Sequence, residues 1–136
     1  MALNLKLSNA TVDAQGDALA PLFNNGYLRI YDGTQAADAD TAVGAQVLLA
    51  ELRFAATGIA TSVNGVLTAN ALIADSSANA SGTATWYRSL QSDGTTAIAD
   101  GSAGTSGTDL ILNSAAISAG AEVSVSSFTH TIPKSA

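Results

Sequence analysis

The segment from Gly82 to Leu112 constrains the fold of this chain more than any other part of the sequence. It reads GTATWYRSLQSDGTTAIADGSAGTSGTDLIL and contains the only tryptophan, Trp86. Its first residues alternate as in a strand, and the Asp93-Gly94 pair predicts a tight turn into a second strand over 95–99. A glycine- and serine-rich loop then leads to a third short strand, TDLIL. Trp86 is expected to anchor the core, on the face that the alternation assigns to Ala84, Trp86, Arg88 and Leu90.

The same period-two pattern recurs on both sides of this segment. GYLRIYD places Leu28 and Ile30 on one face of a strand. A turn-rich stretch, GTQAADADTAVGA, then predicts a long surface loop. The alternation resumes in QVLLAELRF, where one face carries Leu48, Ala50, Leu52 and Phe54, and the other carries Val47, Leu49, Glu51 and Arg53.

Two further features complete the predicted strands. Asn64-Gly65, between two valines, is the strongest short hairpin signal in the chain. In the last strand, predicted over 121–132, the apolar residues change parity between Val125 and Phe128. A β-bulge near Ser126-Ser127 would place the apolar residues before it and after it on the same, core-facing side of the sheet. Pro133 ends the strand because its nitrogen cannot donate a hydrogen bond to a neighbouring strand.

The first 25 residues have a different pattern. Leu3, Leu5 and Leu7 alternate, which predicts a short strand or arm that pairs with the main sheet or lies on a neighbouring subunit. Asn9 is the predicted N-cap of a helix of two to four turns, weakened by Gly16 and Pro21, that closes one end of the sandwich. Its apolar face is expected to contain Val12, Leu19, Leu22 and Phe23.

About eight short strands and one helix predict a mainly all-β fold. We expect residues 1–136 to form a single domain, a two-sheet antiparallel sandwich that is jelly-roll-like or immunoglobulin-like, with 1–25 as an N-terminal arm and helix. Aromatic residues are only 5% of the chain, so few large side chains can fill the core. The predicted core residues are Leu28, Ile30, Leu48, Leu52, Phe54, Leu67, Trp86, Ile98, Leu110, Val123, Phe128 and Ile132.

Composition narrows the classes of partner. The formal net charge is −6, and the five basic residues are scattered along the sequence without a basic run, which disfavours nucleic acid. The absence of cysteine excludes disulfides and thiolate metal sites. No apolar run reaches the ~18 residues of a membrane span, and the first residues lack the pattern of a secretory signal. We therefore expect no membrane partner and synthesis in a cytoplasm.

Few residues are candidates for catalysis or metal binding. His130, the only histidine, is expected on a sheet face of the last strand, and abundant Ser and Asp make a catalytic triad an uninformative coincidence. Asp32, Asp38 and Asp40 flank one loop and could hold a hard cation, although hydrogen bonds within turns are the favoured role. No catalytic, cofactor-binding or metal-binding residue, and no cofactor, is predicted.

Glycines and tyrosines give two more candidates. Gly101, Gly104 and Gly107 form GxxGxxG, which is not the dinucleotide-binding pattern, and a flexible turn is expected there. Tyr27, Tyr31 and Tyr87 could form an exposed aromatic platform for sugar or protein, or they could cover the edge of the core.

Several blocks together resemble a known family. They are GYLRIYDGTQAADADTAVGAQVLLAEL, GVLTANALIADSSANASGTATWYRSLQSDGTT, DGSAGTSGTDLILNS and AGAEVSVSSFTHTIP. From about Gly26 to Pro133 the chain resembles small virion proteins encoded among the structural genes of tailed bacteriophages. It is most similar to the capsid cement, or decoration, proteins of short-tailed phages such as those of Bordetella.

This resemblance implies a structural protein and not an enzyme. Such a protein is a jelly-roll-like homodimer that binds the major capsid protein on the outside of the shell and clamps neighbouring capsomers, after synthesis in the host bacterial cytoplasm. The family offers no catalytic residues to carry over. The alternative from the residues alone is a tail or fibre recognition module that binds host-surface carbohydrate through tyrosines and loops.

Overall fold

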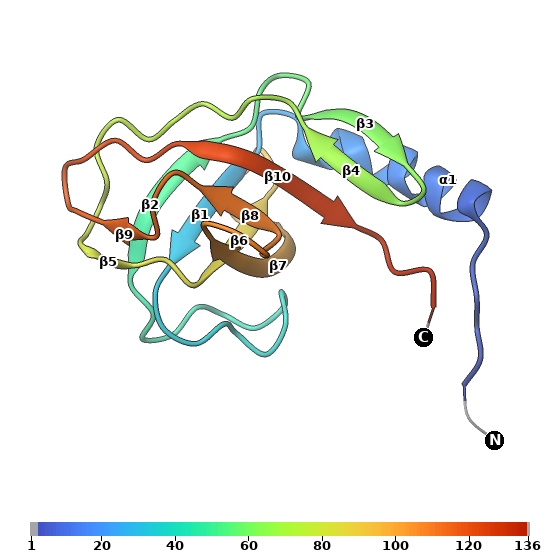
Figure 1. Cartoon of the computed structure of the whole chain (residues 1–136), viewed down its shortest axis with the longest axis horizontal. Coiled ribbons are helices and arrows are strands. Elements are labelled where there is room, and N and C mark those ends of the chain that lie inside the picture. Colours follow the sequence, from blue (N-terminus) through green and yellow to red (C-terminus); the bar gives the residue numbers. More distant parts are fainter. Residues whose placement is uncertain (1–2, 136) are drawn as a thin grey trace.

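The structure, a computed structural model, describes residues 3–135 and is mainly β, with one short helix near the N-terminus (Figure 1). Within this range the helical elements and strands, in chain order, are α1 (Asn9–Leu19), η1 (Ala20–Phe23, a 3-10 turn), β1 (Tyr27–Tyr31), β2 (Leu48–Arg53), β3 (Ile59–Val63), β4 (Val66–Ala69), β5 (Gly82–Thr83), β6 (Trp86–Leu90), β7 (Ala97–Gly104), β8 (Leu110–Leu112), β9 (Ala116–Ile117) and β10 (Val125–Thr131).

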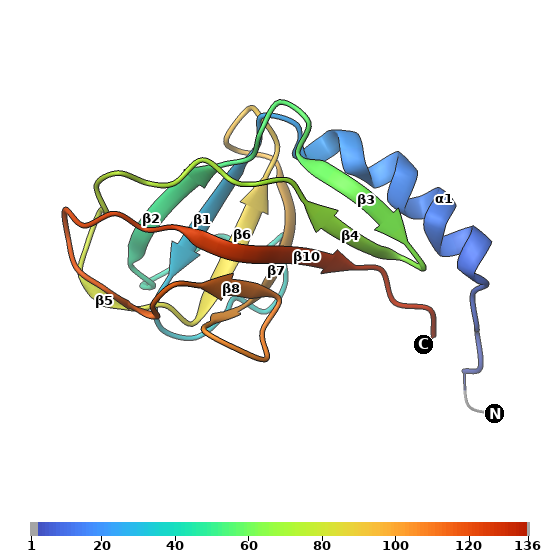
Figure 2. The ribbon, with the colours of Figure 1, turned by 45° about the horizontal axis from the view of Figure 1, so that its top comes forward.

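Over residues 3–135 these strands form an eight-stranded sheet, in the order β2-β1-β6-β7-β8-β10-β4-β3, and a two-stranded sheet, β5-β9. The large sheet curls, so that β10 crosses over β1 and β6 (Figure 2). The β5–β9 pair lies at one end, and α1 lies beside β3 and β4 at the other. The predicted mainly β, sandwich-like class with a helix at one end is confirmed, and the strand order is what the sequence had left open.

Three phenylalanines join the helical segment, the end of β2 and strand β10. They are all the phenylalanines in the chain. Phe23 ends η1, Phe54 follows β2 and Phe128 lies in β10, and each is almost completely buried. The ring centroids are 5.2 Å apart for Phe23 and Phe54 and 5.4 Å apart for Phe54 and Phe128, in edge-on contacts. The Tyr87 ring of β6 contacts Phe128 at 5.2 Å in the same way. These edge-to-face contacts join elements far apart in sequence.

The helix begins one residue earlier than predicted. Ser8, not Asn9, is the N-cap: it has extended backbone, and its Oγ accepts a hydrogen bond from the Thr11 amide at 3.1 Å. Val12 and Phe23 are buried as expected, but Leu22 is 38% exposed. The chain tightens into a 3-10 turn around Pro21, and three residues per turn rotate Leu22 off the apolar face.

A β-bulge in β2 changes which residues face the core. Tyr31 of β1 pairs with Leu48, whereas Ile30 pairs with Ala50, so Leu49 is an extra residue in the ladder. Leu49 is fully buried and Leu48 is half-buried. The predicted core role of Leu48 is therefore wrong, because the alternation breaks at this bulge. Ile98 and Ile132, also predicted in the core, are partly buried and pack against it.

Strand β6 is buried on both faces. All of its residues from Trp86 to Leu90 are less than 9% exposed. Tyr87 belongs to the main core, against Phe128, whereas Trp86 stacks on Tyr31 of β1 with ring centroids 4.7 Å apart. Trp86 is thus buried as predicted, but on the face that the loop of residues 32–47 covers.

The two predicted turns differ in outcome. Asn64-Gly65 joins β3 directly to β4, with φ of +52° and +82°, as a two-residue hairpin turn requires. Asp93-Gly94 also turns the chain, with φ of +70° at Gly94, but β7 begins only at Ala97. The side chain of Asp93 accepts hydrogen bonds from the amides of Thr95 and Thr96, which widens this turn beyond the predicted start at Thr95.

The C-terminal half contains a second bulge and a parallel pair. The register of β10 against β8 shifts between Val125 and Ser127, which confirms the bulge predicted at Ser126-Ser127. Val123 and Phe128 are both buried as a result. The β7–β8 pair is parallel over two residues, and it departs from the antiparallel pattern of the other strand pairs among residues 3–135.

We predict that Trp86→Ala lowers the free energy of unfolding by about 3–5 kcal/mol, because it removes a buried aromatic side chain. It also removes the hydrogen bond from Trp86 Nε1 to the Asp32 carbonyl, at 3.0 Å. Urea unfolding measures the change. Trp86→Phe is the control and should be less destabilising, since it keeps most of the ring stacking; an alanine variant as stable as the native protein would contradict the prediction.

A second prediction concerns Gly16 in α1. A Cβ at this position would clash with Ser62 Oγ and lie 3.0 Å from Leu67 Cδ1. Gly16→Ala should therefore lower the free energy of unfolding by about 1–3 kcal/mol, although the same change in an exposed helix would raise it.

The matched control for Gly16→Ala is the Ser62→Ala background. Ser62 Oγ is buried without a hydrogen-bond partner among the described residues, so its removal should be neutral or stabilising. In this background Gly16→Ala should lose most of its effect. A stabilising Gly16→Ala in the otherwise native chain would show that the contact is not tight.

Candidate functional site: the arginine face and the terminal groove

The three arginines of the chain, which look scattered in the sequence, lie on one face of the large sheet. Arg29 of β1 is paired across the ladder with Glu51 of β2 and with Arg88 of β6. Arg53 of β2 is paired with Tyr27 in the same way. We call these residues, with Tyr31 and Asp100, the arginine face. The arginines are scattered in the sequence, and the strand order brings them together.

Two ion pairs neutralise much of this charge. Arg29 Nε lies 2.7 Å from Glu51 Oε2, at side chains that are 28% and 34% exposed. Arg88 binds Asp100 through Nε at 2.7 Å and Nη2 at 2.9 Å, and these side chains are only 8% and 3% exposed. The hydrogen-bonded Asp100 carboxylate raises the pKa of Arg88. A two-pronged contact of this kind fixes the plane of the guanidinium group.

Arg53 has a different environment. Its guanidinium carbon lies 4.0 Å from the centre of the Tyr27 ring, and its Nη2 donates to the Asn25 carbonyl at 2.8 Å. This cation–π contact covers one face of the Tyr27 ring. Tyr27 is half-buried, Tyr31 is 6% exposed and Tyr87 is 2% exposed on the opposite face of the sheet. The alternative of an exposed platform made of all three tyrosines is therefore wrong, and Tyr87 covers core instead.

Side chains around β6 hold the loop of residues 32–47 over the arginine face. Thr85 Oγ1 donates to the Gly33 carbonyl at 2.6 Å, Trp86 Nε1 donates to the Asp32 carbonyl, and Arg88 Nη2 donates to the Asp38 carbonyl at 3.2 Å. At the end of the loop, Asp32 Oδ1 accepts from the Val47 amide at 2.6 Å. These hydrogen bonds fix the loop to the sheet at residues 32, 33 and 38 and close it at residue 47.

Between this loop and the turn of residues 94–96 lies an open pocket of about 490 Å³, which we call the loop pocket. Arg29, Tyr31 and Arg88 line it from the sheet. The remaining lining residues are Ala39, Asp40, Thr41, Ala42, Val43, Leu90, Gly94, Thr95, Thr96 and Ala97. Burial raises the pKa of Tyr31, against the opposing effect of Arg29 and Arg88, so its hydroxyl stays protonated at neutral pH.

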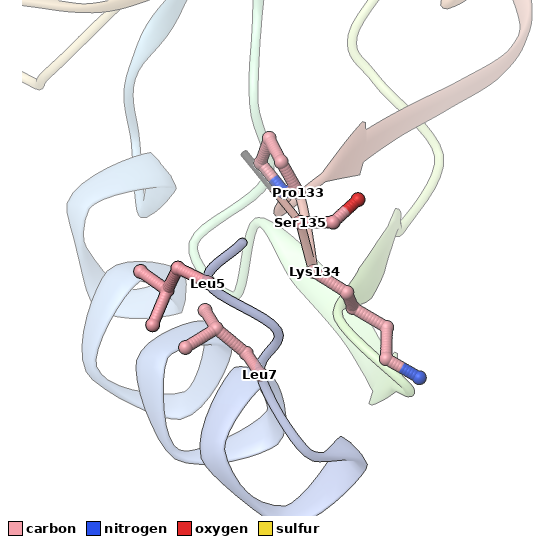
Figure 3. A pocket seen from close by; sticks show the side chains of 5 residues that line it. All are labelled: Leu5, Leu7, Pro133, Lys134 and Ser135. Carbon is pink, nitrogen blue, oxygen red and sulfur yellow. The ribbon is translucent and has the colours of Figure 1, made fainter. Parts of the chain in front are cut away.

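The second surface lies where the two ends of the chain meet. The Leu7 amide donates to the Lys134 carbonyl at 2.7 Å, and Lys6 and Ser135 form an antiparallel bridge. Figure 3 shows the groove between them, with Leu5 and Leu7 from the N-terminal arm and Pro133, Lys134 and Ser135 from the C-terminal tail. Its volume is about 180 Å³, and the Lys134 side chain points away from the two leucines.

This terminal groove continues into exposed apolar surface. Leu3 is 88% exposed and Leu5 is 64% exposed, whereas Leu7 is half-buried. The arm therefore pairs with the C-terminal tail that follows β10, and not with a strand of the main sheet as one alternative expected. Two leucines remain uncovered, and alternating exposed leucines on an extended arm are a surface that a partner can bury.

The other candidates for chemistry have structural roles. His130 packs edge-on against Phe23 with ring centroids 5.6 Å apart, on β10 as predicted. Asp38 accepts from the Asp40 amide and from Thr41 Oγ1, and these hydrogen bonds, that of Thr41 foremost, lower the pKa of Asp38. The hydrogen bonds within turns that were expected for the aspartates are confirmed at Asp38. Within residues 3–135 no three His, Cys, Asp or Glu side chains are placed to hold a metal ion together.

The GxxGxxG glycines do not share one turn. Gly101 and Gly104 lie in β7, and only Gly107, with φ of +67°, lies in the following turn. A Cβ at Gly101 would clash with the Tyr87 ring, so this glycine makes room for the aromatic cluster. The expected flexible turn is therefore wrong for the first two glycines.

Comparisons with family models, curated proteins and solved structures found no match to this chain. In the part of the chain that the structure describes, no helix has the length and apolar character needed to cross a membrane. The two surfaces described above are therefore the main structural basis for a functional proposal.

We predict a pH dependence of stability that comes from His130. Burial lowers the pKa of His130 from its usual 6.5, and Asp109 opposes this shift. In the unfolded chain the imidazole keeps its usual pKa, so below about pH 6.5 the unfolded state binds a proton that the folded state does not. The free energy of unfolding should therefore fall as the pH drops through 6.5 towards the lowered pKa.

Urea unfolding between about pH 7.5 and pH 5.5 measures this effect, since carboxylates titrate mostly below that range. His130→Phe keeps a ring against Phe23 and should remove most of the pH dependence. A phenylalanine variant that loses as much stability as the native protein over this range would assign the effect to other groups.

Proposed function

We propose that this chain is a structural virion protein, a capsid cement or decoration protein that binds the outside of a phage shell and stabilises contacts between capsomers. The observation that carries the proposal is the exposed apolar arm, Leu3 and Leu5, held beside the C-terminal tail. The resemblance of the blocks between Gly26 and Pro133 to phage virion proteins points in the same direction. The proposed partners are the major capsid protein and a second copy of this chain.

The binding free energy expected from such an arm is small for one contact, and it becomes useful on a surface that offers many equivalent contacts. Burying a leucine side chain contributes about 1.5–3 kcal/mol, so two leucines give only a modest interface. A shell presents many equivalent positions, and a protein bound through two copies gains effective concentration at its second contact. Binding that occurs only on the assembled lattice stabilises that lattice by mass action.

The body of the protein is suited to a rigid clamp. The aromatic contacts between Phe23, Phe54 and Phe128 fix the helical end and the two sheet layers to one another. Strand β3 is the last strand of the large sheet, and its Ala60, Thr61 and Val63 are exposed. We propose that the arm or this edge forms the contact between copies, since an open edge can pair with another strand.

The location and copy number of the protein in purified particles test the proposal. A cement protein should be present in hundreds of copies over the shell, by quantitative gel analysis and electron microscopy, and shells without it should fail at lower temperature. A few copies at the tail would overturn the proposal and support a recognition module in a tail or fibre.

We predict that deletion of residues 1–7 abolishes binding to shells that lack the protein, or abolishes dimers. This deletion keeps Ser8, and therefore the N-cap of α1. Co-sedimentation with shells and analytical ultracentrifugation are the measurements. Leu3→Ser with Leu5→Ser should weaken binding in the same direction without removing the backbone of the arm.

The matched control is Leu22→Ser, which changes an exposed leucine far from the arm in sequence. It should bind shells and self-associate as the native chain does. If the truncated chain binds shells and forms dimers undiminished, the arm has no part in either contact.

A further inference from the structure

We propose that the loop pocket is a binding site for a neutral sugar residue, a polyhydroxylated ligand of the size of one or two hexose units. This inference does not depend on shell binding, because the pocket lies on the arginine face and shares no residue with the terminal groove. Its basis is the set of polar groups in the pocket, the balance of charge around them and the rigidity of the loop.

The pocket contains hydrogen-bond donors that the protein itself does not use. Arg29 donates through Nε to Glu51 and also hydrogen-bonds the Tyr31 hydroxyl, which leaves the remaining N–H groups of its guanidinium for a ligand. Arg88 uses Nε and Nη2, which leaves Nη1 without a partner among the described residues. Tyr31 and Thr95, which both carry a hydroxyl group, are also among the residues that line the pocket. Guanidinium and hydroxyl donors at fixed positions are suited to the oxygen atoms of a sugar.

The charge around these donors favours a neutral ligand over an anionic one. Two guanidinium groups, Arg29 and Arg88, are accompanied by three carboxylates, Glu51, Asp100 and Asp40. The whole chain has a formal net charge of −6. A phosphate or carboxylate ligand would meet a surplus of negative charge, whereas a sugar hydroxyl can donate to Asp40 and accept from Arg29.

The shape and the apolar walls also fit a sugar. A volume of about 490 Å³ lies within the range of small-molecule sites. Val43 of the loop is half-buried and lines the pocket, and it offers apolar surface for the C–H face of a pyranose ring. A single carboxylate or ammonium group of a peptide side chain would leave most of this space unfilled.

The pocket is formed before any ligand binds. The hydrogen bonds from Thr85, Trp86 and Arg88 hold the loop at residues 32, 33 and 38, and residue 38 directly precedes the segment 39–43 that lines the pocket. On the other side, Asp93 accepts hydrogen bonds from Thr96 Oγ1 and from the amides of Thr96 and Thr95, which lower the pKa of Asp93 to about 2 and keep the turn closed at neutral pH. Walls that are already ordered lose little conformational entropy on binding, which favours affinity.

The test is a titration of the full chain, labelled with ¹⁵N, with the methyl glycosides of glucose, galactose and mannose, and with glucuronate as the acidic probe. We expect at least one neutral glycoside to shift amide resonances of residues 39–43 and 94–97, with a Kd in the millimolar range. Arg29→Met removes a guanidinium group that lines the pocket at a side chain that is partly exposed, and it should weaken binding about tenfold or more.

Arg53→Met is the matched control, since Arg53 lies on the same face but does not line the pocket, and it should bind as the native chain does. Thr95→Val removes one hydroxyl from the exposed rim and should also weaken binding, which tests the site even if Arg29→Met is poorly folded. The proposal is overturned if no neutral glycoside shifts these resonances up to about 50 mM. Tighter binding of glucuronate, or equal weakening by Arg53→Met, would overturn it too.

Discussion

The contact among Phe23, Phe54 and Phe128 is the interaction on which the rest of the structure depends. It joins the end of the helical segment, the end of β2 and the middle of β10, which are separated by more of the chain than any local interaction spans. The chain has no further phenylalanine that could replace one of these three. The curl of the large sheet follows, because β10 must cross over β6 for Phe128 to meet Tyr87.

Strand β6 connects this core with the arginine face. Tyr87 points into the phenylalanine cluster, and its neighbours Trp86 and Arg88 lie under the loop of residues 32–47. The strand can be buried on both faces only because the long loop replaces water on the outer one, and the loop carbonyls accept the hydrogen bonds of Thr85, Trp86 and Arg88. The same hydrogen bonds that cover the tryptophan therefore shape the loop pocket.

The alternation of apolar residues predicted a β-bulge where the alternation visibly shifts by one residue, and it missed a β-bulge where no shift is visible. In the last strand, Val123 and Phe128 have opposite parities, and the bulge between them was predicted correctly. In β2 the run Val47-Leu48-Leu49 is apolar on both parities, so nothing in the pattern locates the bulge that buries Leu49. For the candidate site, parity placed Tyr27, Arg29 and Tyr31 together, but it could not show that Arg88 lies across from Arg29.

The sequence by itself determined the mainly β class, the N-terminal helix, the Asn64-Gly65 hairpin and most of the core, because turn chemistry and side-chain alternation act over a few residues. Tertiary structure alone decided the strand order, the face of β6 that meets the core and the gathering of the three arginines. A central strand covered on both faces carries no alternation that distinguishes them, and strands distant in sequence become neighbours only when the sheet assembles.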